Sequence, residues 1–223
     1  MNYVIIVAGG SGKRMGSEIP KQFLLLDGKP ILMHTIETFV HAIEDIEIVV
    51  VLPRDQFNYW EELCSEFGFN LNHSVIAGGE ERYHSVKNGL LAIRGEGIVA
   101  VHDGVRPFVS KKIIKNAFNK TRDLKAVTLA VPLKDSIREV RAGESKALNR
   151  DNYQLIQTPQ VFDVSLLKEA FNSPYENSFT DDASVVEAYG RKVHLIEGDY
   201  NNIKITSPED MVFGEAILRS LAL

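Results

Sequence analysis

The fold is decided by the N-terminal stretch Tyr3-Val4-Ile5-Ile6-Val7-Ala8-Gly9-Gly10-Ser11-Gly12-Lys13-Arg14. Its first five residues are apolar and predict a buried strand. The glycines that follow predict a loop whose backbone N–H groups approach an anion without interference from a Cβ atom. Lys13, Arg14 and the later Lys21 add positive charge to this loop. A strand that ends in such a loop is typical of a phosphate site.

The spacing of the loop excludes two well-known phosphate motifs. A P-loop requires a serine or threonine after Gly-Lys, but Arg14 follows Lys13. A dinucleotide fingerprint requires glycine at the third position after Gly12, and that position is Met15. The stretch therefore predicts a phosphate loop of a third kind.

Composition restricts the class of protein. The formal net charge of −5 argues against a general nucleic-acid binder but is compatible with a phosphate ligand. The single cysteine, Cys64, excludes an intrachain disulfide and a cysteine zinc cluster. The chain opens without the basic segment of a signal peptide, and no apolar run approaches the ~20 residues that span a bilayer. We expect a cytoplasmic protein that binds neither membrane nor nucleic acid.

Apolar runs alternate with helical patterns along the chain. We predict strands over 3–8, 46–52, 72–76, 97–102, 126–131 and 192–196, and helices over 31–42, 55–67, 82–93 and 111–122. Such alternation predicts an α/β, Rossmann-like fold, in which a mostly parallel twisted sheet carries helices on both faces. Ligands bind beyond the carboxyl ends of the strands in sheets of this kind.

One polar region interrupts this rhythm. Residues from about 132 to 152 predict a hairpin with little core of its own. The hairpin is either a flexible surface excursion or an arm that packs against a partner, because a hairpin alone is marginal in water. We therefore expect one domain over residues 1–223 that carries a protruding β-arm.

The loop pattern Gly-Gly-x-Gly-x-Arg-Met, followed by Pro-Lys-Gln, resembles that of nucleotidyltransferases that activate sugar and polyol phosphates. Later stretches resemble the 2-C-methyl-D-erythritol 4-phosphate cytidylyltransferase family of the non-mevalonate isoprenoid pathway. These are Gly78-Gly79-Glu80-Glu81-Arg82, His102-Asp103-Gly104-Val105-Arg106-Pro107, Arg150, Gln157-Thr158-Pro159-Gln160, Thr180-Asp181-Asp182-Ala183-Ser184 and Asn202-Ile203-Lys204-Ile205-Thr206. Their order and spacing carry the resemblance over nearly the whole chain. It implies CMP transfer from CTP to the polyol phosphate, and a homodimer clasped through the arm.

The reaction implied by this resemblance gives the loop cations a role. Negative charge builds on the α-phosphate oxygens and on the departing pyrophosphate, so we expect Arg14 and Lys21 to stabilise the transition state. Asp103 follows a predicted strand and is the candidate ligand for Mg²⁺, although it could instead cap a helix before Pro107. His102 should point to the opposite face of the strand and serve structure.

The resemblance assigns the remaining site residues. Arg150 and Lys204 are expected to orient the acceptor phosphate, and Arg150, at the foot of the arm, could serve a site across the dimer. The expected acceptor-binding residues are Asp103, Arg106, Ser136, Thr158 and Thr180. The expected nucleotide-binding residues are Ala8, Gly9, Gly10, Ser11, Gly12, Lys13, Gly79, Glu80 and Ser85.

The chemistry needs no general base. A phosphate monoester has a second pKa near ~6 and is mostly dianionic at neutral pH. Two alternatives stay open at this point: a ribitol-5-phosphate cytidylyltransferase, and a nucleotide-binding regulatory module without turnover. Departures from the family pattern, such as Gly104-Val105 in place of Ala-Ala, bear on the identity of the acceptor.

Overall fold

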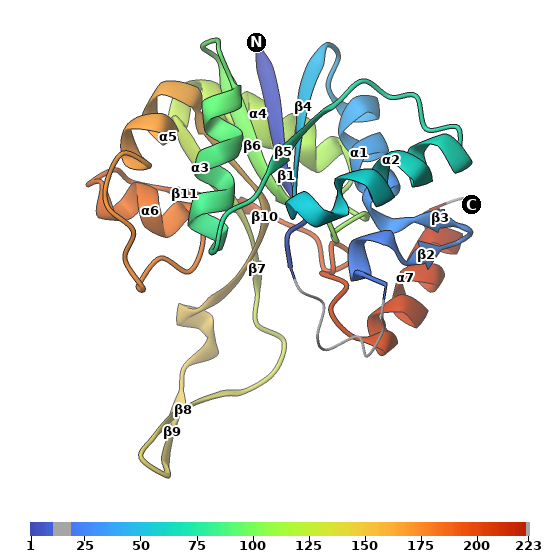
Figure 1. Cartoon of the computed structure of the whole chain (residues 1–223). Helices are drawn as coiled ribbons and strands as arrows, with labels where there is room; N and C mark the ends of the chain where they lie inside the picture. Colours follow the sequence, from blue (N-terminus) through green and yellow to red (C-terminus); the bar gives the residue numbers. More distant parts are fainter. Residues whose placement is uncertain (11–18, 222–223) are drawn as a thin grey trace.

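The computed structural model describes residues 1–10 and 19–221, and its centre is a seven-stranded sheet (Figure 1). The strand order is β11-β7-β10-β6-β1-β4-β5. The strands are β1 (Asn2–Val7), β4 (Ile46–Leu52), β5 (Ser74–Ala77), β6 (Ile98–Asp103), β7 (Ala126–Pro132), β10 (Gln154–Asp163) and β11 (His194–Glu197). Strand β10 runs antiparallel to β6 and β7, and the other pairings are parallel. The predicted mostly parallel α/β sheet is confirmed.

Helices cover both faces of the sheet, as the continuous apolar strands require. Helices α1 (Ile31–Ala42), α2 (Phe57–Glu66) and α4 (Lys111–Leu124) pack on one face, where Val4 and Ile6 point. Helices α3 (Arg82–Ala92), α5 (Val164–Ala170) and α6 (Asp182–Ala188) pack on the other, with Tyr3 and Ile5. Strand side chains thus alternate between two cores. Over the described ranges, no helix is both long enough and apolar enough to cross a membrane.

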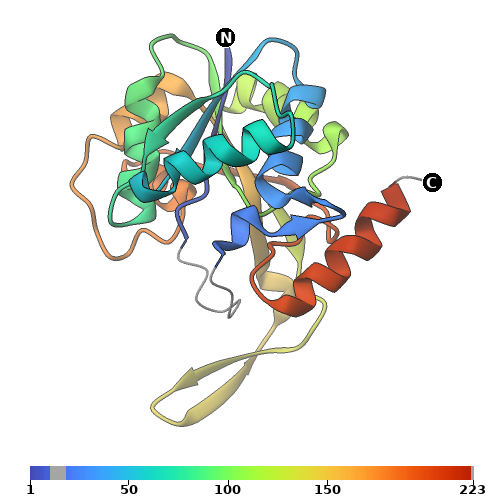
Figure 2. The same ribbon diagram turned by 45° about the vertical axis from the view of Figure 1, so that its right-hand side comes forward.

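A smaller layer lies beside the sheet. Helix α7 (Pro208–Leu221) packs near the short strands β2 (Leu25–Leu26) and β3 (Lys29–Pro30), and Figure 2 shows it along one flank. Leu26, Ile31 and Ile205 form the centre of this third apolar cluster. The cluster fixes the chain that leads into Lys204, which matters for the site below.

The predicted elements fall close to the observed ones. Each of the six predicted strands is present, with ends shifted by at most two residues, and the four predicted helices match α1 to α4. Residues 54–56 form a 3₁₀ turn (η3) before α2 rather than part of it. Helices α5, α6 and α7 had no predicted range. The first two have seven residues each, which is too short to display a helical period.

Strand β10 is the main element that the sequence did not predict. Its ladder with β7 shifts register between Gln157 and Gln160, where Pro159 offers no N–H group. The interruption divides the apolar pattern into two short pieces, so no continuous strand signal exists. The same interruption lies at the carboxyl edge of the sheet, beside the candidate site.

The polar region forms the predicted hairpin. Strands β8 (Ile137–Arg141) and β9 (Glu144–Leu148) pair only with each other in the described structure, and the hairpin projects away from the sheet (Figures 1 and 2). Its two-residue turn, Ala142-Gly143, has φ values of 49° and 85°. Tight hairpin turns of the primed type need positive φ at both residues, which explains the glycine.

Candidate active site

Two cavities open at the carboxyl edge of the sheet, where Val7 of β1 lies beside Asp103 of β6. The first has a volume of about 420 Å³ and is lined by Val7, Ala8, Gly9, Gly10, Lys21, Gln22, Gly79, Glu80, Glu81, Arg82, Ser85, Asp103, Val105 and Lys204. The second, of about 320 Å³, is lined by Arg82, Asp103, Arg106, Ile156, Gln157, Thr158, Gln160, Thr180, Asp181 and Lys204. The two cavities share Arg82, Asp103 and Lys204, so they are neighbouring halves of one site.

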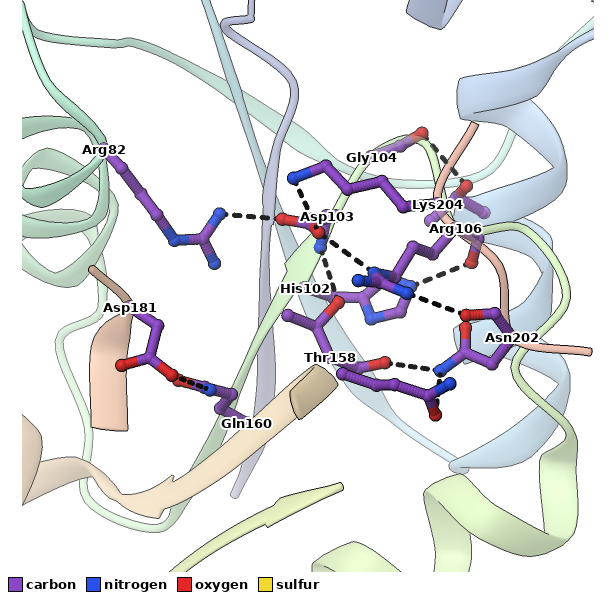
Figure 3. Close-up of polar contacts among 12 residues, drawn as sticks. Arg82, His102, Asp103, Gly104, Arg106, Thr158, Gln160, Asp181, Asn202 and Lys204 are labelled. Carbon is purple, nitrogen blue, oxygen red and sulfur yellow. Dashed lines mark hydrogen bonds and ion pairs between the residues drawn. The ribbon is translucent and has the colours of Figure 1, made fainter. Parts of the chain in front are cut away.

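Asp103 is the centre of a cluster of charges (Figure 3). Its Oδ1 atom accepts from Arg82 at 2.8 Å, and its Oδ2 atom lies 3.1 Å from both Arg106 Nε and Lys204 Nζ. The second arm of the Arg82 guanidinium donates to Asp182 Oδ2 at 2.7 Å. Three cations from α3, the loop after β6 and the segment before α7 therefore meet at one carboxylate.

The charges in this cluster determine the protonation of its members. Burial alone would raise the pKa of Asp103, but Arg82, Lys204 and Arg106 together hold that pKa well below its ordinary range. Burial raises the pKa of Asp182, against the opposing charge of Arg82. The two carboxylates in turn raise the pKa of Arg82, which counters its own burial. Asp103 is thus an ionised carboxylate at neutral pH.

Backbone contacts hold Asp103 and the segment around Lys204 in place. The Asp103 N–H donates to Thr158 Oγ1 at 3.1 Å, which ties the end of β6 to the interrupted part of β10. Asn202 Nδ2 donates to the Thr158 carbonyl at 2.8 Å, and the Asn202 carbonyl accepts from Arg106 Nη1 at 2.7 Å. Lys204 follows this fixed point by two residues, so its ammonium group reaches the cluster from a rigid base.

The turn before α3 closes the other side of the first cavity. The Gly79 N–H donates to Ser85 Oγ at 3.1 Å, which folds the turn back onto the first turn of α3. A Cβ atom at Gly79 would lie 2.4 Å from the Cβ of His84, so this close approach requires glycine. The turn presents Glu80 and the Gly79 backbone to the cavity.

Lys21 is held at the first cavity by its two neighbours in the 3₁₀ turn η2 (Lys21–Phe23). Gln22 is fully buried and donates from Nε2 to Gln56 Oε1 at 2.7 Å. The ring of Phe23 stacks on Trp60 with centroids 5.9 Å apart. A Cβ built on Gly10 would lie 3.6 Å from Lys21 Cε, so the lysine side chain passes over the Gly10 backbone.

His102 points away from the cluster, as strand alternation predicted. Its ring packs edge-on against Phe39 of α1, and its Nε2 atom lies 3.0 Å from the Arg106 carbonyl oxygen. Burial lowers the pKa of His102 to about 4, so the ring is neutral at physiological pH. A buried neutral ring on the opposite face takes no part in proton transfer at the cavities.

Comparison with known proteins identifies the family. The sequence profile of the 2-C-methyl-D-erythritol 4-phosphate cytidylyltransferases, IspD, matches residues 2–220. The chain belongs to this family. A member from Bacteroides fragilis is 50% identical over 214 residues, which cover 96% of this chain and 98% of that protein.

Solved structures agree with the assignment to the IspD family. The 4-diphosphocytidyl-2C-methyl-D-erythritol synthase of Anaerococcus prevotii superposes with a TM-score of 0.82 at 32% identity, covering 98% of this chain and 96% of that one. The cytidylyltransferase of Francisella tularensis gives 0.81 at 33% identity, with coverage of 97% and 99%. Fold and family are therefore consistent along almost the entire chain.

The structure brings most of the predicted IspD site residues together. Lining the first cavity are Ala8, Gly9, Gly10, Lys21, Gly79, Glu80, Ser85, Asp103 and Lys204. Lining the second are Asp103, Arg106, Thr158, Thr180 and Lys204. Ser11, Gly12, Lys13 and Arg14 lie outside the described residues.

Two predicted residues lie in neither cavity. Ser136 and Arg150 are exposed at the foot of the arm, where the chain enters β8 and leaves β9. Arg150 donates from Nη1 to the Lys134 carbonyl at 2.5 Å. Within this one chain, the structure thus separates them from the Asp103 cluster.

Sequence reasoning missed several residues that hold the site together. Arg82 and Asp182 belonged to quoted motifs but had no assigned role, and Gln160 and Asn202 were likewise unassigned. A signal for Arg82 existed, because it occupies the first position of α3, where the helix dipole disfavours a cation. A cation at such a position points to a carboxylate partner.

Proposed function

We propose that the protein carries out the reaction of its family, CMP transfer from CTP to 2-C-methyl-D-erythritol 4-phosphate, and that each cavity takes one substrate. The observation that carries this proposal is the pair of cavities that meet at Arg82, Asp103 and Lys204. The glycine-lined cavity suits the nucleotide, and the hydroxyl-lined cavity suits the polyol. Their junction is the place where an acceptor phosphate and an α-phosphate would come into contact.

On the nucleotide side, the backbone of Ala8 to Gly10 and the Gly79 turn receive CTP. Glycines in these stretches let main-chain groups contact the triphosphate and the base closely. Lys21, with Arg14 from the same loop, stabilises the charge that develops on the α-phosphate and on the pyrophosphate. Preorganised cations of this kind supply most of the rate enhancement in phosphoryl-type transfers.

On the acceptor side, Thr158, Thr180 and Arg106 supply directional hydrogen bonds to the polyol. Lys204 orients the acceptor phosphate toward the first cavity. An oxygen of that phosphate forms a bond to the α-phosphorus of CTP while the bond from that phosphorus to pyrophosphate breaks. No proton moves in this step, in keeping with the absence of histidine among the described residues that line the two cavities.

Asp103 is the residue that would hold Mg²⁺. Across the described residues, no group of three or more His, Cys, Asp or Glu side chains is placed to hold a metal. A single ionised carboxylate nevertheless fits Mg²⁺, which commonly takes one or two carboxylates and fills its other positions with phosphate oxygens and water. The ion, when bound, would supply charge neutralisation on the triphosphate.

The arm gives a reason to propose a homodimer. The β8–β9 hairpin has no apolar core of its own, and Val140, Tyr153 and Leu155 along the arm and its foot are 69%, 42% and 52% exposed. A partner that covers these side chains would stabilise the hairpin. We propose that the arm reaches the partner's site, where it delivers Arg150 and Ser136 to the acceptor.

The rest of the chain acts as one unit. Within residues 1–10 and 19–221, every strand outside the two small hairpins belongs to a single sheet, so we propose one cytidylyltransferase domain over residues 1–223. We also propose that it works in the cytoplasm, since the sole cysteine excludes an intrachain disulfide.

The test of this function is pyrophosphate release with CTP, Mg²⁺ and a panel of acceptors. We expect turnover with 2-C-methyl-D-erythritol 4-phosphate, far less with ribitol 5-phosphate, and none without acceptor. Preferred turnover of ribitol 5-phosphate would contradict the acceptor assignment and leave the reaction class in place. Tight CTP binding without pyrophosphate release under any condition would contradict catalysis and favour a regulatory module.

A further inference from the structure

Arg82 connects two carboxylates that lie on different elements of the site. Its Nη1 atom donates to Asp103 at the end of β6, and its Nη2 atom donates to Asp182 at the start of α6. The Arg82 side chain is 29% exposed and lines both cavities, whereas the Asp182 side chain is 2% exposed. An incoming ligand can therefore reach the guanidinium but not the second carboxylate.

The three cations around Asp103 are not equivalent. Arg82 is bound to Oδ1, whereas Arg106 and Lys204 share Oδ2. Withdrawal of Lys204 alone frees neither oxygen, because Arg106 stays on Oδ2. Withdrawal of Arg82 opens Oδ1 to another ligand, since no other described residue is paired with that atom.

Asp182 offers Arg82 a fixed second partner. Gln160, which is 1% exposed, accepts from the Ala183 N–H at 2.8 Å and donates to Asp181 Oδ2 at 2.8 Å. These bonds fix the first turn of α6, and a capping box between Asp181 and Ser184 fixes it further. The guanidinium can therefore leave Asp103 while its other arm stays paired in the same place.

The backbone that carries Arg82 is also anchored. The adjacent Tyr83 donates from its hydroxyl to the Phe171 carbonyl at 2.8 Å, and its ring stacks on that of Phe171 with centroids 4.8 Å apart. Any change in the Arg82–Asp103 contact is thus a movement of one side chain rather than of α3. Such a movement requires little reorganisation of the fold.

We propose that Arg82 is a positioning residue that occupies the divalent-cation position on Asp103 Oδ1 in the free protein and retains only Asp182 when the nucleotide brings the metal. This inference rests on the proposed function, because it takes Asp103 as the metal ligand. Arg82 keeps the Asp103 carboxylate paired and correctly oriented until the metal arrives. Asp182 acts through Arg82 alone: it keeps the charge of the guanidinium paired when Arg82 leaves Asp103.

The test is calorimetric binding of α,β-methylene CTP, whose α–β bridge carbon prevents transfer, to the full chain. The dissociation constant is measured once with Mn²⁺ and once with EDTA. The metal coupling is the constant with EDTA divided by the constant with Mn²⁺, so a larger coupling means that the metal strengthens nucleotide binding more. In the R82Q variant, loss of the competitor should raise this coupling roughly tenfold, the size of one charge-assisted hydrogen bond. In D182N, Arg82 loses its second charge partner, and the coupling should fall roughly fivefold.

The double variant R82Q/D182N separates this device from a general effect of charge. If Asp182 acts only through Arg82, the double variant should match R82Q. If the removed charges simply act through space, their opposite effects cancel, the double variant returns to the wild-type coupling, and the proposal is wrong. K125Q, which removes a cation from an exposed ion pair with Asp163 elsewhere on the surface, is the matched control and should leave the coupling unchanged.

Other outcomes overturn the proposal in distinguishable ways. An R82Q variant that loses affinity equally with Mn²⁺ and with EDTA shows that Arg82 binds the phosphates directly. If the wild type shows coupling and R82Q leaves it unchanged or lowers it, then Arg82 does not compete with the metal for Asp103 Oδ1. The proposed function is then unaffected. Absence of coupling in the wild type rejects Asp103 as the metal ligand, on which both proposals depend. Where R82Q does not fold, the shape-conserving D182N decides, because unchanged or raised coupling in that variant contradicts the proposal.

Discussion

The Asp103 cluster and the β8–β9 arm differ in how their charged residues are held. In the cluster, each charge has a partner within about 3 Å, and the charged residues lie on α3, at the end of β6, at the start of α6 and in the segments that follow β6 and precede α7. In the arm, Arg138 pairs with Ser145 and Arg141 pairs with Glu139, both on the hairpin itself, and Val140 lies exposed. The five charges of the cluster are paired within one chain, whereas the arm leaves apolar side chains exposed.

This difference separates the residues that a single chain can position from those that it cannot. Lys204 and Arg106 line the second cavity from fixed points of the same chain. Arg150 stands on the exposed foot of the arm and points to a carbonyl of the arm itself. Changes in the cluster should therefore affect stability and catalysis together, and changes in the arm should affect catalysis through assembly.

The largest expected effect is that of Asp103→Asn. The change leaves Arg82, Arg106 and Lys204 without their shared counter-charge and removes the candidate metal ligand. We expect kcat/KM for cytidylyl transfer to fall by at least ~10³ and the free energy of unfolding to fall by about 3 kcal/mol. Pyrophosphate release and urea unfolding measure the two quantities. A variant that loses activity but keeps full stability would contradict the tightly coupled cluster.

Lys21→Ala should lower kcat by ~10²–10³ while changing the free energy of unfolding by less than about 0.5 kcal/mol. The reason is that the proposed role of the Lys21 ammonium is in the transition state, whereas Gln22 and Phe23 hold the turn. Steady-state kinetics and urea unfolding are compared with Lys125→Ala, a surface lysine elsewhere on the chain. Near-normal turnover would remove Lys21 from the mechanism.

The arm is tested by mixing two inactive variants, Asp103→Asn and Arg150→Ala. If Arg150 serves the partner's site, one of the two sites in a mixed dimer is intact. That site combines Asp103 of the Arg150→Ala subunit with Arg150 of the Asp103→Asn subunit. Random mixing after co-refolding should then restore about one quarter of the wild-type activity. Failure to restore any activity in mixed dimers, verified by differently tagged subunits, would show that Arg150 acts in its own chain or not at all.

The effect that is smallest at neutral pH concerns the buried ring of His102. Its pKa is about 4 in the folded protein and near 6.5 in the unfolded chain, so the unfolded state takes up more protons between these values. The free energy of unfolding should therefore decrease as the pH falls from 6.5 to 4, by at most about 1.4 kcal/mol per pH unit. His102→Gln should remove this component of the slope. Parallel stability–pH profiles of the two proteins would refute the assignment.

How much the sequence could predict differs between the sheet and the site. Long apolar runs and helical periods located β1, β4, β6, β7 and α1 to α4, because burial of continuous stretches leaves a periodic signal. Strand β10 left none, since Pro159 and the register shift divide it at the point where it contributes Thr158 to the site. Local irregularity that serves a site conceals the element from pattern analysis.

The candidate site shows the same limit at the level of single residues. Motifs located Asp103, Lys21 and Lys204 because loops after strands carry such residues in recognisable strings. They did not reveal that Arg82 bridges Asp103 and Asp182. Arg82 and Asp182 are separated by 100 positions along the chain. Such long-range pairs depend on how the helices dock, which no local pattern encodes.

The most direct test of the account is a crystal structure with α,β-methylene CTP and Mn²⁺, located by its anomalous scattering. We predict a metal peak within coordination distance of Asp103 and the triphosphate beside Gly10 and Lys21. The second cavity, which Thr158 lines, should be left open for the acceptor. A metal peak remote from Asp103, or a nucleotide seated in the Thr158 cavity, would contradict the division of the two cavities between the two substrates.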